Sequence, residues 1–235
     1  MPEASFSSVL SKRRWRTARP LATPLAALAV DEDPREAAMD GLEQIEKTRR
    51  GAIYADPGID WSTYEQIRLD PATVAFRKNW QRDQNRQQPN RVRVDDVERI
   101  KETMARTFDT VFRAELSEDG GYSLTEDNAE NVLRITPYIE DLDLYAPDTR
   151  SSPGIQRSYA DSLGRMTLRL DFYDSVTGDL IATASENRET PRRGYLQWAN
   201  SVSNTKEARL MFENWARRLR ERLDEARSTQ QGELQ

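Results

Sequence analysis

The stretch that decides the fold is RMTLRLDFYDSVTGDLIATA, residues 165–184. From Arg165 to Tyr173 polar and apolar side chains alternate, and Met166 and Phe172 stand at the two ends of the apolar series. A period of two is typical of a strand with one buried face. Residues 174–179 are rich in turn formers, and residues 180–184 are largely apolar again. We therefore predict a β-hairpin in a sheet that is covered on one face.

Two longer segments have the pattern of amphipathic helices. Residues 95–116 and 205–226 repeat apolar side chains at spacings of three and four, as a helix with one buried stripe does. We expect Asp95 to cap the first helix, with Glu98 three residues later in a capping-box pattern, and Gly120-Gly121 to end it. The polar residues 228–235 are predicted to be a disordered tail.

Shorter patterns surround these elements. Further strands are expected at 67–76, 122–125 and 131–145, and a short helix at 34–48. Pro71 is expected to interrupt the first strand, and Pro137 to mark a bulge or an edge where the apolar parity of the last one changes. The polar stretches 77–93, 146–164 and 188–204 are interpreted as loops.

The order of these elements predicts the fold class. Both helices have a single apolar stripe, and the clearest strand has a single apolar face. The simplest arrangement packs both helices on one face of a mostly antiparallel sheet. We predict one two-layer α+β domain over residues 50–227, preceded by an acidic lead-in over residues 31–49.

Composition excludes several classes of chemistry. The chain has 235 residues and contains neither Cys nor His. Disulfides, thiol nucleophiles, Cys or His metal sites and Ser–His–Asp triads are therefore ruled out. We predict no metal and no cofactor. The net charge of -5 argues against a nucleic-acid-binding protein of the strongly basic kind, so no nucleic acid is expected as a partner.

The first thirty residues resemble a secretory signal. Five basic residues lie between Lys12 and Arg19, and an apolar run with the small-residue step Ala27-Leu28-Ala29 follows. Cleavage after Ala29 fits this pattern and predicts a periplasmic protein. The alternative is a disordered basic arm on a cytoplasmic protein. No stretch reaches the roughly 20 apolar residues that a transmembrane helix needs.

Several segments, taken in order, resemble one family. They are ADPGIDW at 55–61, IRLDPATVAF at 67–76, NVLRI at 131–135, DSVTG at 174–178, NSVSN at 200–204 and FENWA at 212–216. Their sequence and spacing are similar to those of bacterial envelope proteins named domain of unknown function 3313. The resemblance covers roughly residues 40–225 and implies a location in the envelope. Many members resemble lipoproteins, but here Leu28 stands where the lipid-accepting Cys would be.

Acidic residues provide one candidate for chemistry. Asp141 and Asp143, two apart in a predicted strand, would share a face, and Glu140 adjoins them. Paired carboxylates could serve as acid and base in a glycan hydrolase. The alternative is a solvated strand edge whose charges discourage aggregation. The oxygen-rich turn 174–179 could meet Ca²⁺, but it lacks the EF-hand ligand order and fits an ordinary hairpin turn.

Basic loops with tryptophan provide a candidate partner surface. Residues 77–93 contain Trp80 and Arg82, and residues 188–204 contain Arg192, Arg193 and Trp198. Arg beside an exposed Trp is frequent at binding hot spots. A solvated loop, or burial of either Trp under the sheet, is the alternative. The leading hypothesis is a non-enzymatic binding or assembly module of the envelope that recognises a protein or a wall polymer. Its oligomeric state is not predicted.

Overall fold

The chain divides into two compact units, residues 1–37 and 38–235. A computed structural model describes residues of the second unit, namely 39–87, 91–118, 121–145, 158–160, 164–190, 197–199 and 201–233. The predicted signal segment therefore lies outside the described residues.

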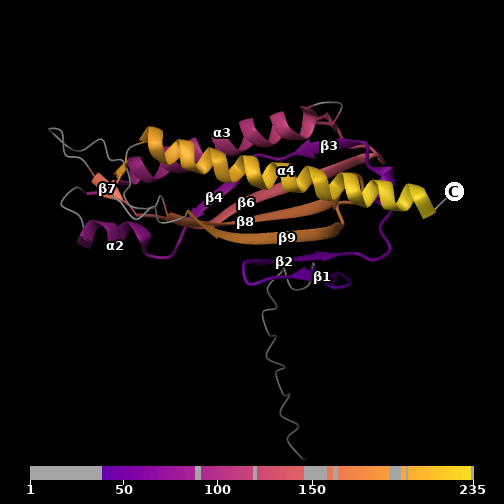
Figure 1. The fold of residues 1–235 in the computed structure, drawn as a ribbon, viewed down its shortest axis with the longest axis horizontal. Coiled ribbons are helices and arrows are strands. Elements are labelled where there is room, and N and C mark those ends of the chain that lie inside the picture. Colours follow the sequence, from indigo (N-terminus) through magenta and orange to yellow (C-terminus); the bar gives the residue numbers. More distant parts are fainter. Residues whose placement is uncertain are drawn as a thin grey trace, which may run out of the picture. The chain divides into compact units, whose positions relative to one another are not determined.

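The second unit is built on one mixed sheet (Figure 1). Its strands are β1 Glu43–Lys47, β2 Gly51–Ala55, β3 Gln66–Leu69, β4 Thr73–Phe76, β5 Ser123–Leu124, β6 Val132–Leu144, β8 Gly164–Asp174 and β9 Leu180–Glu189. They lie in the order β1-β2-β9-β8-β6-β3-β5, and β4 also pairs with β6. The neighbours along β1-β2-β9-β8-β6 pair antiparallel. Strands β3 and β4 pair in parallel with β6, and β5 pairs in parallel with β3. A separate ribbon joins β7 Ser158–Ala160 to β10 Gln197–Ala199.

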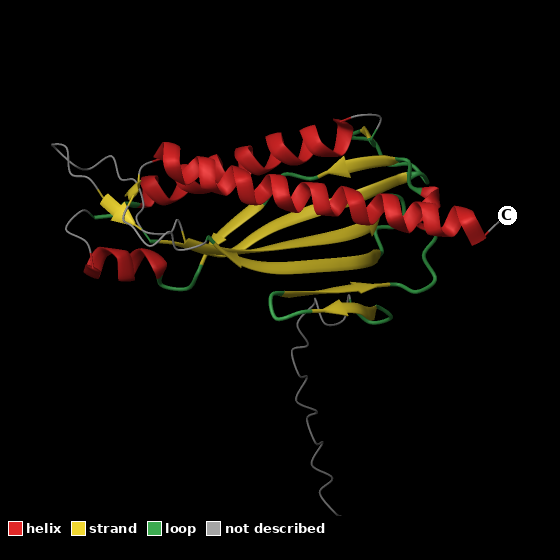
Figure 2. Cartoon of the chain, in the orientation of Figure 1, coloured by secondary structure: helices red, strands yellow, loops and turns green. Residues whose placement is uncertain are grey.

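The helices complete the second layer. They are α2 Trp80–Gln87, α3 Val94–Ser117 and α4 Ser201–Glu233, and a short 3-10 helix, η1, spans Trp61–Thr63. The two long helices, α3 and α4, lie over the same face of the sheet (Figure 2). This arrangement confirms the predicted two-layer α+β fold. The opposite face of the sheet, which these two helices do not cover, is called the open face below.

The core lies between the long helices and the sheet. Phe108 of α3 stacks on Phe112 at 3.9 Å between ring centroids and meets Phe212 of α4 edge-on at 5.5 Å. Beneath them, Ile135 and Ile139 of β6 are completely buried. Side chains of this size each contribute about 1.5–3 kcal/mol when fully buried, so this layer holds the helices to the sheet.

The parity change in β6 occurs later than predicted. Pro137 pairs in register with Leu170 and is not a bulge. The irregularity lies between Glu140 and Asp143, where Asp141 has a φ of 50°. Pro137 is tolerated because it falls between the stretches of β6 that pair with β3 and with β4, where fewer ladder bonds are needed. The predicted interruption at Pro71 is confirmed, because β3 and β4 flank it.

Four local expectations are corrected. Residues 43–47 form β1 rather than part of a helix over 34–48. They pair with β2 as an edge strand that is exposed almost throughout, so no apolar alternation marks them in the sequence. The stretch 77–93 contains α2. The ribbon of β7 and β10 lies within the stretches predicted as loops. The predicted disordered tail is helical as far as Glu233.

The cap of α3 also differs from the prediction. The helix begins at Val94, so Asp96 and not Glu98 is its third residue. The Arg93 backbone N–H donates to the Asp96 carboxylate at 3.1 Å. The contact from the third helical residue to the capping N–H, expected from a capping box, is therefore present two residues earlier than the sequence pattern indicated.

Candidate functional site

Trp80, one of the predicted partner-surface residues, lies in the core. Its side chain is 1% exposed, stacks on Phe76 at 4.0 Å between ring centroids, and donates from Nε1 to the Leu144 carbonyl at 3.1 Å. Trp80 is therefore not available to a partner. In the sequence, burial of Trp80 is indicated only by its spacing of four from Gln84, because a helix places two such residues on the same face.

Arg82 does lie on the surface, two residues after the buried Trp80 in α2. Its side chain is 57% exposed and its Nε is 3.5 Å from the carboxylate of Asp83. Asp83 also pairs with Arg77 at 2.8 Å, and the hydrogen bond from Arg77 lowers the pKa of Asp83. An exposed Arg with only a long ion pair can exchange it for a partner at little cost.

The other predicted surface residues are only partly described. Arg192 and Arg193 lie outside the described residues. Trp198 lies in β10, where its backbone pairs opposite Tyr159 of β7. The stretches 146–164 and 188–204, both predicted as loops, therefore contain backbone pairing that the polar sequence did not reveal.

Helix α2 and strand β7 lie at one end of the sheet, which we call the loop end. Trp80 and Gln84 of α2 both donate to the carbonyl of Leu144, the last residue of β6. Gly164, the first residue of β8, exchanges hydrogen bonds with Thr190, which follows β9. β7 precedes Gly164 by a few residues, and β10 leads directly into α4, which it contacts. Figure 1 shows α2 and β7 at this end.

The carboxylates proposed for hydrolysis are not a matched pair. Asp143 is 6% exposed and lies between two guanidinium groups, at 2.9 Å from Arg77 and 3.4 Å from Arg165. Asp141 sits on the bulge and is exposed. Glu140 pairs with Arg169 at 3.1 Å. The bulge separates the two aspartates into different surroundings, which removes the shared face that a period of two predicts, and the arrangement gives no support for acid–base catalysis.

The open face has a network centred on Arg169. Its guanidinium lies 3.8 Å from the centre of the Tyr138 ring and also pairs with Asp171 and Glu140. Asp171 in turn accepts a hydrogen bond from Thr183 at 2.7 Å. Burial opposes the charge, but the hydrogen bonds to Asp171 and Glu140 raise the pKa of Arg169. The network spans β6, β8 and β9 and stiffens the centre of the face.

A second network lies beside it at β3 and β6. Arg134 pairs with Asp70 at 2.7 Å, and Thr136 donates to the same Asp70 oxygen at 2.8 Å. The Arg134 guanidinium also lies 5.8 Å from the Tyr173 ring. In both networks each positive charge has a carboxylate beside it. In these two networks the charges of the open face are therefore neutralised by one another.

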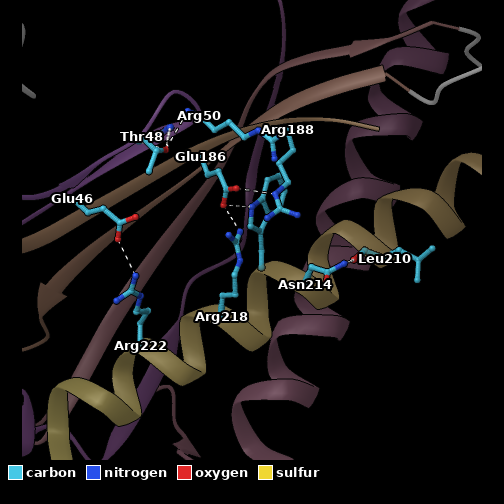
Figure 3. Close-up of polar contacts among 11 residues, drawn as sticks. Glu46, Thr48, Arg50, Glu186, Arg188, Leu210, Asn214, Arg218 and Arg222 are labelled. Carbon is cyan, nitrogen blue, oxygen red and sulfur yellow. Dashed lines mark hydrogen bonds and ion pairs between the residues drawn. The ribbon is translucent and has the colours of Figure 1, made fainter. Parts of the chain in front are cut away.

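A third cluster links the sheet to α4 (Figure 3). Glu186 of β9 accepts a hydrogen bond from Trp215 Nε1 at 2.8 Å, pairs with Arg188 at 2.8 Å, and pairs also with Arg218. Burial opposes ionisation, but the hydrogen bonds from Arg188, Arg218 and Trp215 lower the pKa of Glu186. Farther along α4, Arg222 reaches Glu46 of β1 at 2.9 Å. These contacts hold the last helix over β9 and the edge hairpin.

The turn considered for Ca²⁺ is occupied by its own backbone. Oδ1 of Asp174 accepts from the N–H groups of Val176 and Thr177 at 2.9 and 2.8 Å, and Oδ2 accepts from the Tyr64 hydroxyl at 3.2 Å. Within the described residues no group of three or more acidic side chains could hold a metal ion. No helix in the described part of the chain is long and apolar enough to cross a membrane.

Comparisons with known proteins place the chain in a family. The model of the family described as "Protein of unknown function (DUF3313)" matches residues 36–219. No curated protein matches the chain.

Solved structures with a similar course of the chain have low identity. A DUF330 protein from Xanthomonas campestris is 12% identical, covers 75% of this chain and 93% of its own, and has a TM-score of 0.42. The PelC dodecamer from Paraburkholderia phytofirmans is 10% identical over 69% of this chain and 95% of its own, with a TM-score of 0.31. A minor lipoprotein from Acinetobacter baumannii is 13% identical over 70% and 95%, with a TM-score of 0.29.

Proposed function

The chain belongs to the DUF3313 family, and we propose that it is a non-enzymatic binding or assembly module of the bacterial cell envelope. The observation that carries this proposal is the construction of the loop end. There α2 is bonded to the last residue of β6, and the ribbon of β7 and β10, whose strands come from segments distant in sequence, contacts α4. A rigid scaffold that presents polar segments suits recognition, because little freedom is lost on binding.

The partner is a protein or a wall polymer that contacts the loop end. Arg82 on α2 is the described contact residue, and Arg192, Arg193 and Trp198 are proposed to extend the same surface. Trp80 supports this surface from below: its indole N–H holds α2 to Leu144. It is a positioning residue rather than a contact residue.

The location follows from the first thirty residues. Their basic region, apolar run and Ala27-Leu28-Ala29 step support export and cleavage after Ala29. Mass spectrometry of the protein from fractionated cells tests this. A periplasmic chain that begins at Val30 is the expected result. A cytosolic chain that retains Met1 would overturn the location and leave the binding proposal to be tested with cytoplasmic partners.

Site-specific crosslinking tests the loop end. A photoreactive residue at Arg82 is compared with one at Arg217, which is exposed on α4 far along the chain from α2. We expect a discrete adduct from position 82 and none of that size from position 217. The same adducts from both positions, or none from position 82 in cells that make the protein at its natural level, would contradict the proposal.

A further inference from the structure

A groove on the outside of the helix layer has an unusual lining. It lies between α3 and α4, has a volume of about 210 Å³, and contains six residues: Thr103, Arg106, Thr107, Thr110, Thr205 and Arg209. The lining thus combines two guanidinium groups with four threonine side chains. It is separate from the networks of the open face and from the contacts that hold α4 to the sheet.

The two arginines differ in their engagement. The Arg209 side chain is 59% exposed, and its Nε donates to Glu213 at 2.8 Å. A guanidinium has five N–H groups, so this contact leaves terminal donors for a ligand. Arg106 is exposed, and its guanidinium has no hydrogen bond or ion pair with the residues that the structure describes. The groove therefore has uncommitted donors with positive charge.

The threonines supply the opposite kind of group. The hydroxyls of Thr103, Thr107 and Thr110 each donate to a backbone carbonyl one turn earlier, at 2.8, 2.7 and 2.8 Å. A hydroxyl has a single hydrogen, so each of these oxygens remains only as an acceptor. Their methyl groups make the rest of the lining apolar. Inorganic phosphate near neutral pH presents mainly acceptors and at most one or two hydroxyl donors, so most of its oxygens would meet these threonine oxygens unfavourably.

We infer that this groove binds a carboxylated sugar unit of an acidic polysaccharide. The carboxylate accepts from Arg106 and Arg209 in charge-assisted hydrogen bonds. The sugar hydroxyls donate to the threonine oxygens, and the C–H groups of the ring pack on the threonine methyls. This ligand class satisfies all three parts of the lining, whereas phosphate satisfies one and a neutral glucan two.

The inference goes beyond the proposed function, since it concerns the helix layer and not the loop end. Either can fail alone: crosslinking at Arg82 is independent of the groove, and sugar binding in vitro is independent of location.

Titration of the full chain tests the groove, with polygalacturonate as the acidic polymer. Dextran and inorganic phosphate serve as the neutral and the purely anionic probe. We expect saturable binding of polygalacturonate by the natural chain. Arg106→Gln should bind it about tenfold more weakly, because one charge-assisted contact is lost. Arg106→Lys should bind with intermediate affinity, because it keeps the charge but not the planar fork. Thr107→Val keeps the shape of the side chain but removes the hydroxyl acceptor. It should therefore lower the affinity for polygalacturonate toward the affinity for phosphate.

Arg217→Gln is the matched control, because it removes one positive charge from an exposed site of α4 outside the groove. It should bind like the natural chain. Equal loss in Arg106→Gln and Arg217→Gln would reduce the effect to net charge and overturn the inference. Binding of phosphate or dextran as tight as that of polygalacturonate would also overturn it. Circular dichroism melting of each variant separates lost binding from lost folding.

Discussion

Glu186 shows how a single residue ties sheet and helix together. Its position faces the helices, opposite Leu168, where an apolar side chain would be expected. The carboxylate is accommodated because Trp215, Arg188 and Arg218 all donate to it. A partly buried carboxylate of this kind contributes to stability mainly because its removal leaves charged donors unpaired.

The lowered pKa of Glu186 makes stability depend on pH. A carboxyl with a folded pKa below its unfolded value of 4.5 stabilises the fold above pH 4.5, and this contribution is lost as pH falls through the folded pKa. We expect Glu186→Gln to lower the free energy of unfolding by about 1–3 kcal/mol at pH 7, measured in urea. Between pH 5 and 3 the free energy of unfolding of this variant should vary less than that of the natural chain. Glu221→Gln, at an exposed site of α4, is the control and should keep the natural pH profile.

Trp80 and Arg82 are two positions apart and have opposite environments. Trp80→Ala should lower the free energy of unfolding by about 3–5 kcal/mol, because it empties a buried site and leaves the Leu144 carbonyl with one donor fewer. Arg82→Ala should change it by less than about 0.5 kcal/mol. Chemical denaturation of both variants checks this. Equal effects would mean that α2 is not fastened to the sheet as described.

At the scale of elements, the last helix is longer than its buried stripe. Leu223 is the last buried apolar side chain among the described residues of α4, at 7% exposure. Ser228 and Thr229 are exposed, and their hydroxyls donate to carbonyls one turn earlier in the same helix. A chain that ends at Arg227 should therefore unfold within about 0.5 kcal/mol of the full chain. A chain that ends at Arg222 should lose at least about 2 kcal/mol, because Leu223 is removed. Thermal or urea unfolding distinguishes these outcomes, and a large loss in the first chain would show that the end of α4 has a packing partner.

At the scale of the whole unit, the sheet is unevenly protected. β8 lies between β6 and β9 along its length, whereas β1 is an edge strand with a bulge and an exposed Ile45. Amide exchange should be slowest in β8 and fastest in β1, with opening free energies that differ by more than about 2 kcal/mol. Hydrogen exchange with mass spectrometry measures this. Uniform protection would mean that the edge hairpin opens only when the whole unit unfolds.

Several elements could not be predicted from the sequence because they lack the usual apolar pattern of their type. Strand β1 shows no apolar alternation because it is an edge strand exposed almost throughout. Helix α2 lacks an apolar stripe because its inner side contains a glutamine, Gln84, that pairs with a strand carbonyl. The sequence predicts a bulge or an edge at Pro137, whereas the bulge of β6 lies at Asp141. For the candidate surface, sequence alone could not separate the buried Trp80 from the exposed Arg82. The groove between α3 and α4 was not foreseen, since its threonines are unremarkable until two helices align them.

The sequence by itself determined the α+β class, the hairpin at residues 165–184, the two packed helices and the family. These depend on period and local turn chemistry, which neighbouring residues encode. Only the tertiary structure decided which polar side chains are buried, where the carboxylates find their arginines and which surfaces come together at the loop end. Those outcomes depend on contacts between segments far apart in the chain, such as Arg77 with Asp143, and no local pattern specifies them.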